Sequence, residues 1–301
     1  MANRKSHDQN FKNLILDYPH EALAFFAAEE AEDLTPSVKI TPIRQEQLKE
    51  RLGDRFHELD VPLLVEWPDG KREALLFTLE EETDPNRFSI HRLAHYTLHL
   101  SELFETERVV PVVIFLHSNQ NIAESLHIKS ERHSYLQFSY LHTELSRLPA
   151  KQFFGSQNIV ARLNLPNMNW ADKDKIEVYA SAIQGLFALE SSVEKQLKYI
   201  DFVDIYSELN EDERKAYQRR YPQEESKMAG LAERLRNEGM QQGMQQGLHE
   251  GIEGALRLQL KLKFGELPEW VEVKLQQASD SQLTHWLTRI LSCDNLSELL
   301  E

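Results

Sequence analysis

The sequence is poor in cysteine, in basic residues and in long apolar runs. Its 301 residues include one cysteine, Cys293, which excludes a disulfide within the chain and a cysteine-rich zinc site. No apolar run approaches the ~18 residues that a membrane helix needs. The basic residues near the N-terminus are not followed by the apolar stretch of a signal peptide. We therefore expect a protein of the reducing cytoplasm that does not contact a membrane.

Basic residues are outnumbered by acidic ones. Lys and Arg total 34 and Asp and Glu total 49, which gives a net charge of -15. Proteins that bind nucleic acid through phosphate contacts alone are usually basic. The deficit is uneven, because residues 61–120 carry 5 basic and 10 acidic groups whereas residues 121–200 carry 9 and 8. The charge argues against nucleic-acid binding by the whole surface and leaves room for a local basic patch.

Apolar periodicity predicts a mixture of helices and strands in the first 120 residues. Residues 59–67 alternate apolar and polar side chains, Pro68-Asp69-Gly70 has the composition of a turn, and residues 73–82 form a second alternating run. This pattern predicts a β-hairpin. A β-branched run at 109–117 predicts a buried strand. The other predicted elements are a helix over 7–30 broken at Pro19, a short charged helix within 40–56, and a helix over 87–104.

The second half of the chain has a helical pattern. Residues 135–145 predict a weaker strand, and helices are predicted near 172–189, 193–208 and 211–220. Within 237–254 glycines recur every four residues, at Gly239, Gly243, Gly247 and Gly251. Each glycine costs a helix about 1 kcal/mol relative to alanine, so this segment is either a flexible linker or a helix that associates with a copy of itself. Residues 255–301 predict several short helices that form a small domain.

The hairpin carries the carboxylates with the clearest chemical potential. Asp60 begins its first strand, and Glu80 and Glu82 share one face of its second strand, with Glu81 on the other. Asp60 and Glu80 are each ten residues from Gly70, which predicts that they lie at the same end of the hairpin. Converging carboxylates bind Mg²⁺ through hard oxygen ligands. The alternative is a solvated acidic edge without a ligand.

Several segments taken together resemble one protein family. They are SHDQNFKNLI near the N-terminus, the hairpin LDVPLLVEWPDG…LLFTLEEETDP, the following FSIHRLAHYTLHL, the glycine repeat and the small C-terminal helical domain. In this order they resemble the PD-(D/E)XK nuclease-family transposases, also called recombination-promoting nucleases. The resemblance implies a restriction-endonuclease-like α/β fold, with a mixed sheet flanked by helices. It also implies DNA as the partner and Mg²⁺ or Mn²⁺ as the cofactor.

The resemblance also implies roles for particular residues. Asp60 matches the motif aspartate, Glu80 matches the motif glutamate, and the carbonyl of Glu81 matches the backbone metal ligand. Glu82 stands where the family has Lys or Gln, so a third carboxylate replaces the group that orients the attacking water. Arg92 matches a frequent family arginine and can take the cationic role, or it can form an ordinary salt bridge to the acidic cluster.

Histidines offer rival metal ligands. His91, His95 and His99 recur every four residues on the predicted helix after the hairpin, and helical histidines at this spacing can bind zinc. They can equally be partly buried structural side chains. The His7-Asp8 pair is similar to the metal-binding doublet of HD phosphohydrolases, but we interpret it as a feature of the first helix. Asp8 or Glu21 from that helix can also complete the hairpin's metal site.

Together these patterns predict an α/β nuclease-like domain at 1–225, a helical glycine-repeat segment or linker at 226–254, and an all-α domain at 255–301. The predicted activity is Mg²⁺-dependent DNA endonuclease. The alternative is a catalytically inactive interaction protein with a nuclease fold, which Glu82 and the net charge of -15 favour. The glycine repeat predicts a homodimer.

Overall fold

The computed structural model describes residues 2–31, 34–43, 61–68, 70, 72–80, 88–117 and 122–300. The chain is a mixed α/β protein that divides into two compact units, Met1–Met228 and Ala229–Glu301. The boundary lies three residues beyond the predicted end of the first domain at residue 225. Among the described residues, no helix combines the length and the apolar character that crossing a membrane would require.

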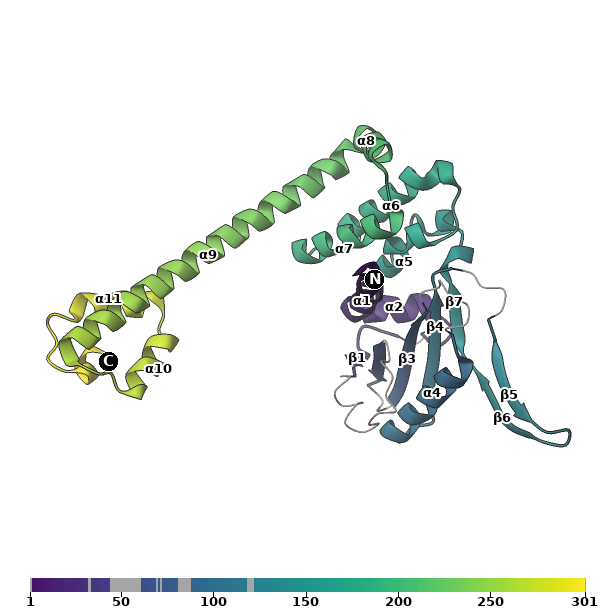
Figure 1. Ribbon diagram of the computed structural model, residues 1–301, viewed down its shortest axis with the longest axis horizontal. Coiled ribbons are helices and arrows are strands. Elements are labelled where there is room, and N and C mark those ends of the chain that lie inside the picture. Colours follow the sequence, from purple (N-terminus) through teal and green to yellow (C-terminus); the bar gives the residue numbers. More distant parts are fainter. Residues whose placement is uncertain are drawn as a thin grey trace. The chain divides into compact units, whose positions relative to one another are not determined.

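The first unit contains a five-stranded mixed sheet in the order β1-β2-β3-β4-β7 (Figure 1). Its strands are β1 (Lys39–Pro42), β2 (Val61–Glu66), β3 (Arg72–Glu80), β4 (Val109–Phe115) and β7 (Leu141–Glu144). The first three strands pair antiparallel, whereas β3, β4 and β7 run parallel. The predicted hairpin and the predicted buried strand are therefore confirmed as β2, β3 and β4. The parallel strands bring their carboxyl ends to one edge of the sheet.

Both faces of the sheet are covered. Helix α4 (Ile90–Phe104) connects β3 to β4 and lies on one face of the sheet (Figure 1). Ser89 caps its first turn by accepting a hydrogen bond from the Arg92 backbone N–H at 3.3 Å. On that face Leu93 and Leu100 pack with Val113 and Phe115. Helices contact the opposite face as well. The strand residues that point to that face are therefore equally buried, and they include Leu63, Val65, Val112 and Ile114.

The remaining helices of the first unit carry much of its core. The break at Pro19 is confirmed, because α1 (Ala2–Asp17) ends before it and α2 (Pro19–Phe26) begins on it. After the sheet come α5 (Ile159–Leu163), α6 (Lys175–Leu189), α7 (Val193–Ser207) and α8 (Glu211–Arg220), with short 3-10 turns at Leu145–Arg147, Ala150–Phe153, Leu165–Asn167 and Asp172–Asp174. The last three of these helices confirm the predicted ones. Residues 44–56 of the predicted charged helix lie outside the described part of the chain.

The predicted strand at 135–145 is two strands. Strand β6 (Ser134–Ser139) pairs with β5 (Ser125–Lys129) in a separate two-stranded sheet, and β7 follows after the buried Tyr140. The apolar residues Leu126 and Phe138 anchor the base of this β5–β6 hairpin on the α4 core. The prediction of a single strand was wrong because the chain passes from one sheet to the other at Tyr140, where no Gly or Pro marks a break. The Tyr140 hydroxyl donates a hydrogen bond to the Ala123 carbonyl at 2.8 Å.

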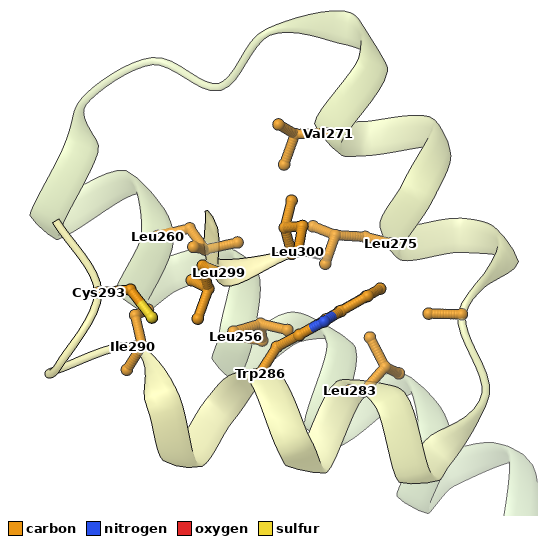
Figure 2. Packing of buried hydrophobic residues seen from close by; sticks show 11 residues of the cluster. Leu256, Leu260, Val271, Leu275, Leu283, Trp286, Ile290, Cys293, Leu299 and Leu300 are labelled. Atoms are coloured by element: carbon orange, nitrogen blue, oxygen red, sulfur yellow. The ribbon is translucent and has the colours of Figure 1, made fainter. Parts of the chain in front are cut away.

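The second unit is all-α. Helix α9 (Pro222–Phe264) contains the whole glycine repeat, and α10 (Glu269–Gln277), α11 (Asp280–Arg289) and α12 (Leu296–Leu299) follow. Apolar side chains from all four helices and their connections form one core (Figure 2), which comprises Leu256, Leu260, Val271, Leu275, Ala278, Leu283, Trp286, Ile290, Cys293, Leu299 and Leu300. The glycine repeat is thus helical, and its association with a second copy stays a prediction.

Candidate metal centre

The β2–β3 hairpin places the predicted ligands at the ends of two paired strands. Its antiparallel register runs from Val61 opposite Phe77 to Glu66 opposite Arg72. The connection is thus centred on residue 69, the middle of the predicted Pro68-Asp69-Gly70 turn. The turn is five residues long, with Gly70 in the left-handed region at φ 80° and its N–H donating to the Trp67 carbonyl. Asp60 lies outside the described residues, so its place at the same end of the hairpin as Glu80 stays a prediction.

Glu80 is the last residue of β3 and lies at the edge where the parallel strands end. Its Cα is level with Phe115 of β4, which is in turn level with Glu144 of β7. The structure describes the backbone of Glu80 but not its side chain, and Asp60, Glu81 and Glu82 lie outside the described residues. Val61 begins β2 directly after Asp60, so the strands that border Asp60 and Glu80 are neighbours in the sheet.

Arg92 lies in the first turn of α4, which follows the strand that Glu80 ends. Its side chain is exposed, and its backbone N–H bonds to the capping Ser89. The connection at 81–87 lies outside the described residues. A guanidinium at the start of this helix can contact a phosphate that approaches this edge of the sheet.

Glu144 is a carboxylate at the same edge that the sequence patterns did not single out. Its side chain is only 9% exposed, and its Oε2 lies 2.9 Å from Nε of the exposed Arg147. Burial, and to a smaller extent the charges of Glu124 and Glu144, raise the pKa of the neighbouring Tyr140 hydroxyl. The sequence patterns missed it because only the parallel pairing of β7 with β4 brings Glu144 level with Phe115 and hence with the end of β3.

The histidines of α4 do not form a three-ligand group. His91 and His95 are exposed, His99 is half-buried, and the rings of His95 and His99 are 6.4 Å apart. Across the described part of the chain, no three His, Cys, Asp or Glu residues lie close enough together to hold a metal ion. The side chain of Asp8 is not described, and Glu21 lies in the first turn of α2, where its carbonyl accepts a hydrogen bond from Asn158.

The best-defined polar cluster of the first unit joins α1 to α7. The carboxylate of Asp17 accepts hydrogen bonds from Lys198 Nζ and the Tyr199 hydroxyl, both at 2.7 Å. Burial of Asp17 disfavours its charged form, yet these two bonds together hold the pKa of the carboxyl below its usual value. Beside it, the Tyr18 hydroxyl donates to Glu190 at 2.5 Å. Each carboxylate of this cluster accepts a hydrogen bond from a neighbouring side chain. The cluster therefore connects helices of the first unit and does not have the arrangement of a metal site.

The chain matches no protein-family model, no curated protein and no solved structure.

Proposed function

We propose that the protein is a Mg²⁺- or Mn²⁺-dependent DNA endonuclease related to the recombination-promoting nucleases. The observation that carries the proposal is the pairing of β2 with β3, which makes the strand after Asp60 a neighbour of the strand that ends at Glu80. In the resembling family the metal is held by an aspartate and a glutamate from two successive strands. The parallel strands β3, β4 and β7 end at the same edge.

The donor set of this edge suits a hard divalent cation. The carboxylates of Asp60 and Glu80 and the carbonyl of Glu81 would hold it, since Mg²⁺ and Mn²⁺ prefer oxygen ligands. A bound divalent cation lowers the pKa of water and offsets charge on a phosphodiester. Glu82 supplies a carboxylate that can accept the proton of the attacking water, and Arg92 a guanidinium that can bind a phosphate oxygen.

The β5–β6 hairpin is the part of the first unit best suited to contact DNA. Its tip carries the exposed Lys129 and Arg132, and Tyr135 beside them is 68% exposed. It belongs to the region 121–200, where basic residues are not outnumbered. The major groove of DNA admits a two-stranded β-ribbon, and cations on such a ribbon bind phosphates without requiring a basic protein overall.

The second candidate is an interaction protein that has lost catalysis. Glu82 in place of the family's Lys or Gln favours it, because a third carboxylate adds negative charge where a phosphodiester must approach. The two candidates differ in one measurable property, the dependence of DNA cleavage on a divalent cation. Either protein would work in a reducing compartment such as the cytoplasm, where the buried thiol of Cys293 stays reduced.

The experiment compares cleavage of single- and double-stranded DNA by the wild type, Asp60→Ala, Glu80→Ala and Glu81→Ala, with and without Mg²⁺ or Mn²⁺. We expect metal-dependent cleavage that falls by about 100-fold or more in the first two variants. Glu81→Ala is the matched control, because it removes a neighbouring carboxylate and keeps the carbonyl that would bind the metal. Absence of metal-dependent cleavage by the wild type, together with an unchanged melting temperature on metal addition, would overturn the nuclease and favour the interaction protein.

A further inference from the structure

One face of α9 carries an exposed apolar seam. Large side chains on it are exposed to unusual extents for apolar groups: Met240 66%, Met244 75%, Leu248 60%, Leu258 61% and Leu262 79%. Successive residues of an α-helix are rotated by about 100°, which brings these five side chains within about 80° of one another. The small exposed residues Gly247, Gly251 and Ala255 lie on the same face. We call these eight residues the α9 seam.

The α9 seam is separate from the core of the second unit. Leu256 and Leu260, which are fully buried in that core, lie on the side of the helix roughly opposite to the seam. A methyl group added at Gly247 or Gly251 would meet no atom within 4 Å beyond the adjacent backbone of its own helix. No described residue therefore packs against the glycines of the seam, and a contiguous apolar face of this size is typical of an interaction site.

The residues of the seam are arranged symmetrically about Gly251. Met240 and Leu262 lie eleven residues on either side of it, Met244 and Leu258 seven, and Gly247 and Ala255 four. In an antiparallel pair of α9 helices with a two-fold axis at Gly251, each of these residues meets its counterpart on the other copy. The small residues allow close approach where the helices cross.

Charge also permits this pairing. Residues 240–262 contain two acidic residues, Glu250 and Glu253, and two basic residues, Arg257 and Lys261, and are therefore neutral in a chain of net charge -15. Two copies that meet at this segment therefore bring together no net charge. A parallel pair would instead set each residue of the seam against the same residue of the other copy, and the symmetry of the seam about Gly251 would then have no role.

We propose that the α9 seam binds a second copy of this chain in an antiparallel, two-fold arrangement centred on Gly251. The proposal does not depend on the nuclease activity, because the seam lies entirely in the second unit. The sequence pattern predicted a contact through the row of glycines. The proposed contact is instead formed mainly by the exposed Met and Leu residues of the seam.

The mass of the full chain in solution tests the proposal. Sedimentation at tens of micromolar should give a dimer for the wild type and a monomer for Met244→Glu, because the substitution places an unpaired charge in the apolar contact and raises the dissociation constant about 100-fold or more. Gln245→Glu is the matched control, since it adds the same charge at an exposed residue of α9 outside the seam and should leave the dimer intact. Unchanged helicity and melting of Met244→Glu diluted to the monomer range, compared with wild type at the same dilution, show that the variant folds.

Disulfide trapping tests the orientation. Chains with Met244→Cys and with Leu258→Cys should form a crosslinked dimer only when the two are mixed, whereas the native thiol, which is buried, should not react. Crosslinking of Met244→Cys with itself would overturn the antiparallel arrangement. A monomeric wild type, or a dimer that Met244→Glu leaves unchanged, would overturn the proposal.

Discussion

The two units of the chain differ in what holds them together and in what their sequences reveal. The second unit is stabilised by one apolar core, whose members recur at helical spacing along the chain. The first unit combines a sheet of distant segments with buried polar contacts, such as Asp17 to Tyr199 and Asn158 to the Glu21 carbonyl. Local periodicity is enough to predict the former, whereas the latter depends on contacts between residues more than a hundred positions apart.

The largest effect on stability is expected in the core of the second unit. Leu260→Ala removes a fully buried side chain and should lower the free energy of unfolding of this unit by about 2–5 kcal/mol. Leu262→Ala is the control, since that side chain is 79% exposed. It should be nearly neutral at concentrations below the proposed dimer's dissociation constant. Urea denaturation monitored by circular dichroism measures both, and equal losses would contradict the assignment of the two faces of α9.

In the first unit, Gly185 packs so closely against Arg162 that it leaves no room for a side chain. A methyl group at Gly185 in α6 would lie 2.8 Å from Cβ of the buried Arg162 and closer still to its guanidinium. Gly185→Ala should therefore destabilise this unit by about 1–3 kcal/mol. Gly155→Ala is the matched control, because a methyl group there meets nothing within 4 Å. Thermal unfolding of both variants distinguishes them, and a neutral Gly185→Ala would show that Arg162 is free to move aside.

Cations at the tip of the β5–β6 hairpin should contribute to DNA binding. Replacing both Lys129 and Arg132 by alanine should reduce the slope of log affinity against log salt by about 2. The control is Lys173→Ala with Lys227→Ala, which removes two cations from helices of the same unit. Fluorescence anisotropy with a labelled duplex gives the slopes. Equal slopes for the two double variants would exclude the hairpin as the DNA contact.

The smallest expected effect is a dependence of stability on pH. The pKa of Asp17 is lowered in the folded chain, so its ion pair and hydrogen bonds stabilise the fold above the unfolded value of about 4. This contribution is lost as the pH falls through the folded pKa. Asp17→Asn should cost about 1 kcal/mol at pH 7 and little at the lowest pH that the fold tolerates. A cost that does not depend on pH would show that packing, and not charge, is what Asp17 supplies.

Periodicity predicted most elements of the fold but not the register of the site. Three predicted elements were confirmed because a single pattern of burial extends along each of them. They are the strands at 59–67 and 109–117 and the helix at 87–104. Which residues of β2 and β3 lie opposite each other depends on where the turn between them is centred. Pro68 and Gly70 fit a turn centred on residue 69 or on residue 70, and the structure has the former. Glu144 was missed for a related reason, since only the pairing of β4 with β7 brings it level with the end of β3.

The position of Cys293 provides a selective chemical probe. It is the only thiol of the chain, it is 3% exposed, and it lies in the core of the second unit near Ile290 and Leu299 (Figure 2). A thiol reagent added to the native protein can react only after this unit opens, so its rate of labelling reports that opening and is blind to the first unit. The opening of the second unit can therefore be timed in the intact protein without introducing a further cysteine.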